Sequence, residues 1–157
     1  CLEGNRPLLV EMQALVARTP YGMPRRTAVG FDYNRVNMLL AILEKRLGMD
    51  FGTQDVYVNV VGGARVTEPA ADLAVIAAIV SSYRNKPVMP GILAVGEVGL
   101  TGEVRRVGFV ERRIKEAQNL GFQKFVTPTG NLSAKSLPTG IIQVNTVEEA
   151  LAAFFEK

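Results

Sequence analysis

The chain contains no histidine and only one cysteine in 157 residues. Without histidine it cannot form a Ser-His-Asp triad or a Cys-His pair, which excludes those forms of nucleophilic catalysis. The same scarcity excludes a tetrahedral zinc site built from cysteine and histidine. The single thiol, Cys1, cannot form an internal disulfide. A serine–lysine dyad is therefore the serine-protease mechanism that remains to be considered.

Two further absences concern the location of the protein. No apolar run approaches the roughly 18 residues that a membrane span needs, and no secretory signal pattern opens the chain. Hydrophobic residues make up 48% of the sequence and aromatic residues 7%, which favours an aliphatic core. Because this length is typical of one domain, we expect a single cytoplasmic domain over residues 1–157 with no membrane partner.

The residue pattern predicts strands and helices that are interleaved without a strict βαβ rhythm. Apolar alternation and β-rich stretches predict strands over residues 8–16, 55–61, 91–98, 104–107, 122–126 and 141–144. A helix is expected from the N-cap Asp32 to Leu47, with Gly48 as its stop. Further helices are expected over residues 70–82, 109–120 and 147–155, the first of them apolar nearly all round and therefore buried. The fold class is α+β, or mixed α/β.

Glycines precede the second predicted helix, at Gly62 and Gly63. They could bind an anion at the helix N-terminus, or form a bulge between a strand and a turn. The sequence contains no Gly-x-x-x-x-Gly-Lys-Ser/Thr motif, so the chain has no P-loop and is not expected to hydrolyse ATP by itself.

Carboxylates and serines near these turns are candidate catalytic or metal-binding groups. The carboxylates could bind a metal or act as an acid/base pair, or could be solvated groups at loops and helix ends; they are Glu68, Asp72, Glu97 and Glu103. Ser133 and Ser136 flank Lys135 in a polar loop, which is weak evidence for a dyad. Ser81 and Ser82 lie at a predicted helix end, where small polar residues commonly terminate helices.

Basic residues exceed acidic ones by 18 to 15, giving a net charge of +3 and a pI near 9.2. This balance permits a polyanionic partner without requiring one. Arg25–Arg26, Arg65 and Arg105–Arg106 lie in predicted loops or strand ends. Their planar guanidinium groups could converge on phosphate oxygens, or they could be scattered solubilising charge.

Three stretches together resemble Lon proteases. Residues 64–74 resemble the segment that carries the nucleophilic serine, residues 96–104 the glycine-rich segment after it, and residues 107–113 the helix start that carries the catalytic lysine. The resemblance implies the Lon proteolytic-domain fold, related to the second domain of ribosomal protein S5. Ala70 stands at the serine position and Glu111 at the lysine position. Alanine has no nucleophilic oxygen and a carboxylate cannot act as the amine base, so the resemblance implies a proteolytically inactive domain.

A narrower resemblance covers nearly the whole chain. Residues 24–30, 32–35, 58–63 and 96–100 are similar to the C-terminal Lon-like domain of the RadA (Sms) family of bacterial DNA repair proteins. In that family a zinc finger and a RecA-like ATPase, absent from this sequence, precede the domain, so the resemblance implies an excised C-terminal domain. It also implies a hexameric ring, ATP-driven helicase activity in branch migration and DNA recombination, and the recombinase RecA as a partner. ATP, Mg²⁺ and Zn²⁺ would belong to the preceding parts, and this domain would hold no cofactor or metal.

The same resemblance implies DNA binding through basic residues. On the matching motifs the candidates are Arg26, Arg35, Arg65 and Arg105 or Arg106, with Arg6 and Arg25 as weaker ones. Loop arginines without interleaved aromatic residues contact the phosphate backbone rather than the bases, and the DNA would be single-stranded or branched. Three functions are thus compared: a DNA-binding and hexamer-forming platform, a pure oligomerisation scaffold without DNA contact, and a residual peptidase.

Overall fold

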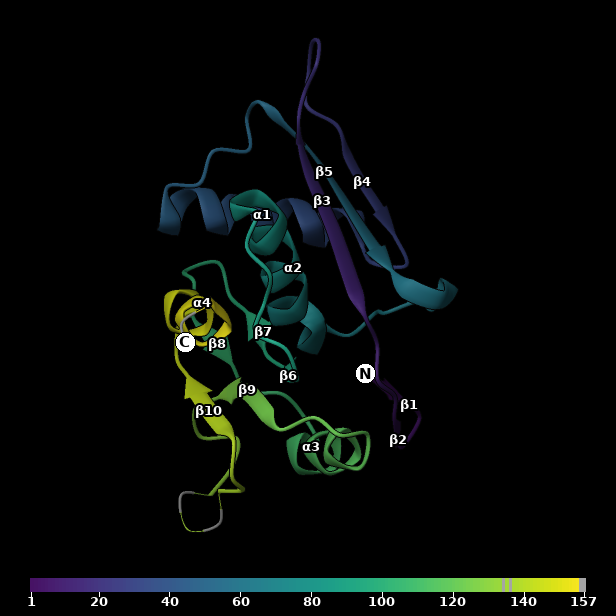
Figure 1. Ribbon diagram of the computed structural model, residues 1–157, viewed down its shortest axis with the longest axis vertical. Coiled ribbons are helices and arrows are strands. Elements are labelled where there is room, and N and C mark those ends of the chain that lie inside the picture. The colour runs from purple at the N-terminus through teal and green to yellow at the C-terminus, as the bar shows by residue number, and fades with distance from the viewer. Residues whose placement is uncertain (134, 136, 156–157) are drawn as a thin grey trace.

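The computed structural model describes residues 1–133, 135 and 137–155. It is a mixed α/β structure, which confirms the expected fold class (Figure 1). The strands are β1 Leu2–Glu3, β2 Arg6–Pro7, β3 Met12–Arg18, β4 Arg26–Val29, β5 Gln54–Val60, β6 Ile92–Ala94, β7 Glu97–Val98, β8 Val104–Arg105, β9 Lys124–Pro128 and β10 Ile141–Val144. The α-helices are α1 Tyr33–Leu47, α2 Asp72–Arg84, α3 Val110–Asn119 and α4 Val147–Phe155, with 3₁₀ turns at Val61–Gly63 and Pro69–Ala71.

The first sheet has the strand order β3-β5-β4. β3 pairs antiparallel with β5, whereas β4 and β5 are parallel and are joined through α1. Side chains alternate along β5, so Val56, Val58 and Val60 lie in the core. Leu15 and Val29, on the opposite face, are exposed. Helices therefore cover one face of this sheet, and the other face is open in the described part of the chain.

The second sheet is parallel and has the order β10-β9-β6. The central strand β9 is buried on both faces, as is usual for parallel sheets covered by helices. Phe125 belongs to a small core with Ile114 of α3, whereas Val126 belongs to the main core with Leu151 and Phe154 of α4. The helices α3 and α4 thus cover opposite faces of β9.

Helix α2 lies between the two sheets (Figure 1). It packs along β3 on one side and contacts β6, β7 and α4 on the other. Leu73, Ile76 and Ile79 are fully buried, which confirms the prediction of a helix surrounded by core. No helix among the described residues combines the length and apolar composition needed to cross a membrane.

Helix α1 begins and ends where the sequence predicts. The Asp32 side chain accepts a hydrogen bond from the Arg35 backbone N–H at 2.7 Å, and Gly48 closes the helix at φ +65°. The expected core face is confirmed for Val36, Leu39, Leu40 and Leu43. Leu47 is only partly buried, however, and Ile42 is in the core instead.

Of the six predicted strands only that over 141–144 has the predicted bounds, and two of the others differ most. The first begins at Met12 instead of Leu8 and runs to Arg18, because residues 12–18 are those that pair with β5. The strand expected over 91–98 is interrupted after Ala94. There the Gly96 N–H donates to the Ala70 carbonyl (2.9 Å), and the Gly96 carbonyl accepts from the Leu73 N–H (3.3 Å). The backbone of Gly96 is thereby bound to the start of α2 instead of continuing the sheet.

Candidate functional site

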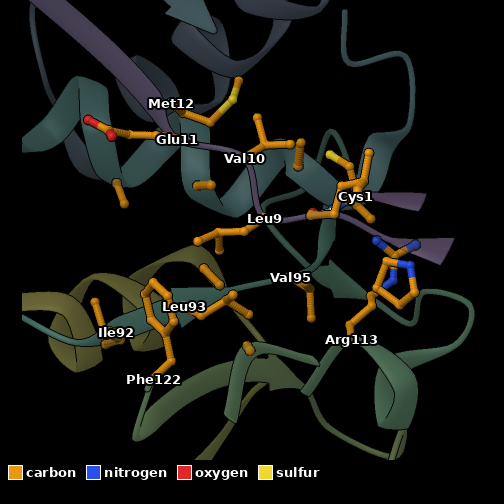
Figure 2. A pocket seen from close by; sticks show the side chains of 18 of the residues that line it. Cys1, Leu9, Val10, Glu11, Met12, Ile92, Leu93, Val95, Arg113 and Phe122 are labelled. Atoms are coloured by element: carbon orange, nitrogen blue, oxygen red, sulfur yellow. Dashed lines mark hydrogen bonds between the residues drawn. The ribbon is translucent and has the colours of Figure 1, made fainter. Parts of the chain in front are cut away.

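Ala70 lines an apolar hollow of about 420 Å³ (Figure 2). One side is formed by residues 7–12, among them Leu9 and Met12, and the other by Leu93 of β6, by Val95 just after β6 and by Phe122. Alanines along α2 leave the space open because their side chains are short. Glu111 is exposed in the first turn of α3, as a helix-start acid is expected to be, and is not among the described residues that line this hollow.

The serines do not form a dyad with lysine in the described part of the chain. Ser82 Oγ accepts the Val16 N–H of the edge strand β3 at 2.9 Å, and Ser81 Oγ donates to the Lys86 carbonyl at 2.7 Å. Ser133 Oγ accepts the backbone N–H of Lys135 at 3.4 Å. Ser136, the remaining candidate, lies outside the described residues.

At the rim of the hollow, Arg113 forms a two-pronged ion pair with Glu68. Its Nη1 and Nη2 atoms donate to the two carboxylate oxygens at 2.9 and 2.8 Å, and its Nε donates to the Gly108 carbonyl at 2.9 Å. The Arg113 side chain is only 6% exposed. Burial alone would raise the pKa of Glu68, but the hydrogen bonds and charge of Arg113 outweigh it and hold that pKa below its ordinary value.

This pair predicts an acid-dependent contribution to stability. A carboxyl whose folded pKa is depressed stabilises the protein above its unfolded pKa, here 4.5, and loses that contribution as the pH falls further. Glu68→Gln keeps a hydrogen-bond acceptor but removes the charge, so it is expected to lower the free energy of unfolding by about 1–2 kcal/mol at pH 7. In urea unfolding, this gap should shrink at pH 3. A gap of the same size at both pH values would contradict the assigned role.

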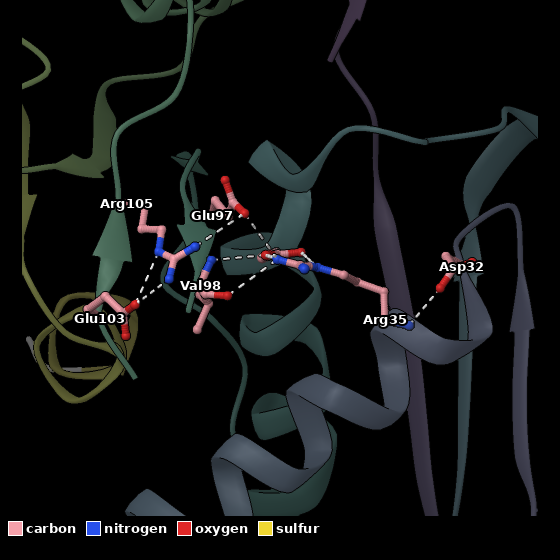
Figure 3. Close-up of polar contacts among 7 residues, drawn as sticks. Asp32, Arg35, Glu97, Val98, Glu103 and Arg105 are labelled. Atoms are coloured by element: carbon pink, nitrogen blue, oxygen red, sulfur yellow. Dashed lines mark hydrogen bonds and ion pairs between the residues drawn. The ribbon is translucent and has the colours of Figure 1, made fainter. Parts of the chain in front are cut away.

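A second network connects Arg35 of α1 with Val98 of β7 (Figure 3). Its central residue is Asp72, the first residue of α2, which is fully buried. The Arg35 guanidinium donates to both carboxylate oxygens of Asp72, by Nε at 2.9 Å and by Nη2. The Val98 N–H donates to Asp72 at 2.9 Å, and the Val98 carbonyl accepts from Arg35 at 3.3 Å. Glu97 lies 3.8 Å from Arg35 and 4.0 Å from Arg105. Asp72 is therefore neither a solvated carboxylate nor, in the described residues, a member of a metal-ligand cluster.

The electrostatics of this network follow from burial and pairing. Burial raises the pKa of Asp72, while Arg35 and the Val98 N–H act in the opposite direction. The hydrogen bond to Asp72 raises the pKa of Arg35. At the exposed end, Thr101 and Arg105 lower the pKa of Glu103 to about 2, because its carboxylate accepts hydrogen bonds from both side chains.

The candidate arginines fall into two groups. Those whose guanidinium groups already bind protein include Arg35, Arg105, which pairs with Glu103 at 2.8 Å, and Arg26, which donates to the carbonyls of Phe51 (2.8 Å) and Gln54. The exposed candidates that form no side-chain hydrogen bond or ion pair among the described residues are Arg6, Arg25, Arg65 and Arg106.

Only some of these arginines are brought together. Arg35 and Arg65 line one hollow of about 560 Å³, beside Gly30 and Gly63. Arg35 and Arg105 share Glu97. Gly62 and Gly63 both have positive φ, within the 3₁₀ turn at Val61–Gly63, so a bent connection rather than a helix N-terminus occupies this place.

Sequence reasoning misses two features. Arg113 carries no local signal, because its partner Glu68 lies 45 positions away and no short pattern links the two. Tyr21 and Met23, in the connection between β3 and β4, are the most exposed of the large hydrophobic side chains. The sequence feature that could have indicated their exposure is an aromatic residue in a loop rich in proline and glycine.

Comparisons with known proteins agree with part of the expected resemblance. The chain is 51% identical over 152 residues to the DNA repair protein RadA of Bacillus subtilis and 50% identical over 152 residues to that of Halalkalibacterium halodurans, in each case over 96% of this chain. It is 48% identical over 156 residues, or 98% of this chain, to the DNA repair protein RadA of Streptococcus pneumoniae. The chain spans only 33%, 33% and 37% of the lengths of these relatives, respectively.

A family model matches residues 13–131. The matched range includes the first sheet, α2, the Arg35–Asp72 network and the Arg113–Glu68 pair, and it therefore covers most of the chain. On this match, the chain belongs to the family described as subunit ChlI of Mg-chelatase.

Proposed function

We propose that this chain is a Lon-like domain without protease activity that binds the phosphate backbone of DNA. The observation that carries the proposal is the set of exposed arginines without protein partners in the described chain: Arg6, Arg25, Arg65 and Arg106. Unpaired guanidinium groups remain available to phosphate oxygens. The paired arginines stabilise the fold in this proposal instead of contacting DNA. They are Arg26, Arg35 and, while it is paired with Glu103, Arg105.

The loss of protease chemistry is supported by the surroundings of Ala70. Its methyl group lies in a hollow lined mainly by aliphatic side chains. Glu68 and Arg113, the charged pair at the rim of this hollow, are bound to each other. Neither a hydroxyl nor a lysine is found among the described residues that line this hollow, so no serine–lysine pair is available there.

The role of the longer protein is part of the same proposal. Its relatives are named DNA repair proteins, and this chain spans about a third of their length. We infer that the domain acts within a bacterial, cytoplasmic, hexameric, ATP-driven helicase in recombinational repair, as a platform for branch migration beside RecA. ATP hydrolysis would belong to another part of that protein, since no P-loop occurs in this sequence.

A second function is favoured by the open face of the first sheet. Leu15 and Val29 are 57% and 54% exposed there. Exposed apolar side chains on a sheet face are typical of surfaces that another subunit covers. The domain would then be an oligomerisation scaffold that makes no DNA contact of its own.

Salt dependence of binding tests the first function. Arg25→Ala and Arg65→Ala are each expected to reduce the slope of log affinity against log salt concentration by about 0.7–0.9, because each removes one phosphate contact. Their melting temperatures should stay close to that of the unchanged protein, since both side chains are exposed. Fluorescence anisotropy with a labelled oligonucleotide at several salt concentrations measures the slope.

The matched controls are Arg26→Ala and Arg35→Ala. These should lower the melting temperature and leave the salt slope unchanged, because their guanidinium groups bind carbonyls and a carboxylate. If a sample with verified oligomeric state binds no oligonucleotide at low salt, the DNA-binding function is wrong and the scaffold function remains.

A further inference from the structure

The connection between β3 and β4 projects from the rest of the molecule (Figure 1). We call residues 19–25 the β3–β4 tip. Tyr21 is 93% exposed and Met23 is 87% exposed. Neither side chain contributes to the core, and the open sheet face begins at the base of the tip.

The base of the tip is held by a set of hydrogen bonds. Thr19 donates from its N–H to the Thr53 carbonyl and from its Oγ1 to Asp55, both at 2.9 Å. The Arg25 N–H donates to the same Asp55 carboxylate at 2.7 Å. This backbone hydrogen bond lowers the pKa of Asp55, which keeps the anchor ionised. Pro20 and Pro24 further restrict the backbone on either side of Tyr21.

The charge around the tip is positive. Arg18 directly precedes the tip and Arg25 is its last residue; both are exposed, and neither forms an ion pair among the described residues. The nearby carboxylate, Asp55, is buried and accepts hydrogen bonds from the chain itself. An aromatic ring between two free guanidinium groups matches the alternation of base and phosphate along an unpaired strand. A second copy of this surface would instead place positive charges against each other.

We propose that Tyr21 stacks on an unpaired base of single-stranded or branched DNA, while Met23 packs beside it and Arg18 and Arg25 bind the adjacent phosphates. This inference rests on the proposed DNA-binding function and deepens it. The contact is with the face of a base, so it is specific for unpaired strands but tolerant of sequence, since every base has a π-face. It also departs from the expectation that the domain contacts phosphates alone.

The chain contains no tryptophan, so Tyr21→Trp introduces a single reporter at the tip. Addition of oligo(dT) at low salt is expected to quench the fluorescence of the introduced indole saturably, because stacking on a base quenches it. Leu120→Trp, at the exposed C-cap of α3, is the matched control and should respond little, because α3 lies at the opposite end of the molecule from the tip (Figure 1). Tyr21→Ala should weaken oligo(dT) binding by roughly 5- to 150-fold, whereas Tyr21→Phe should retain it. Affinity for blunt duplex DNA should be unchanged in both variants.

Three results distinguish a failure of base stacking by Tyr21 from a failure of DNA binding by the domain. Salt-dependent binding of oligo(dT) with no quenching in the Tyr21→Trp variant and no loss in Tyr21→Ala overturns the stacking role and leaves phosphate binding intact. If Tyr21→Ala changes the sedimentation coefficient of the protein instead of its DNA affinity, the tip is a contact between protein subunits and the inference is wrong. Absence of any DNA binding by the unchanged protein overturns both.

Discussion

Arg35→Ala is expected to lower the free energy of unfolding by about 3–5 kcal/mol, because it leaves Asp72 buried without its counter-charge. Asp72 would retain one hydrogen bond, from the Val98 N–H. For a domain of this size the loss corresponds to a fall in melting temperature of about 6–20 °C. Thermal and urea unfolding followed by circular dichroism measure the effect. The same variant removes one of the arginines that the sequence suggested for DNA binding, so stability and affinity must be measured together.

Two further variants show whether the missing charge is the cause. Arg105→Ala removes an exposed guanidinium from the outer end of the same network, and its effect should be within about 0.5 kcal/mol. In the double variant Arg35→Met with Asp72→Leu, both charges of the pair are gone, and most of the lost stability should return. A double variant as unstable as Arg35→Ala would mean that the geometry of the pair, and not the unpaired charge, holds this region together.

Gly30→Ala is expected to lower the free energy of unfolding by about 2–5 kcal/mol. Gly30 has φ +79°, a left-handed conformation that costs about 1–2 kcal/mol for other residues. An added Cβ would also lie 2.5 Å from the Ala64 carbonyl oxygen and 2.8 Å from Val60 Cβ, and relieving such overpacking costs about 1–3 kcal/mol. The Gly30 carbonyl accepts the Val66 N–H at 2.7 Å, so a shift here would disturb the wall of the hollow that contains Arg65.

Gly62→Ala is the control for backbone strain alone. Gly62 has φ +81°, but an added Cβ would meet nothing within 4 Å. Urea unfolding should therefore show a loss of only about 1–2 kcal/mol for this variant. Equal losses of unfolding free energy in the two variants would contradict this explanation. They would show that the contact between an added Cβ and Ala64 costs little and that only the positive φ destabilises the protein.

The parts of the fold that sequence reasoning predicted well are those determined locally. Asp32 and Gly48 define α1 through bonds within five positions, and the range of α4 is the predicted one. The apolar, alanine-rich run after Pro69 predicted the buried helix α2, although the helix spans residues 72–84 instead of 70–82. Errors occurred where distant backbone decides the outcome. Gly96 leaves its strand because it binds Ala70 and Leu73, which precede it by more than twenty positions.

The candidate site was less predictable for the same reason. Arginine doublets indicate where positive charge lies, but whether a guanidinium is free depends on its tertiary partners. Arg25 and Arg26 are adjacent in sequence, yet Arg25 is exposed while Arg26 donates to the carbonyls of Phe51, before β5, and of Gln54, the first residue of β5. Arg35 meets Asp72 across 37 positions. No rule of composition or spacing distinguishes such residues before the chain is folded.

Helix α2 has a mechanical consequence. It is packed against β3 along one side and against β6, β7 and α4 on the other. A force applied to the β3–β4 tip would therefore pass through β3 into α2 and on to the second sheet. The path from the tip to the second sheet thus runs through elements that pack directly against one another, and not only along the chain.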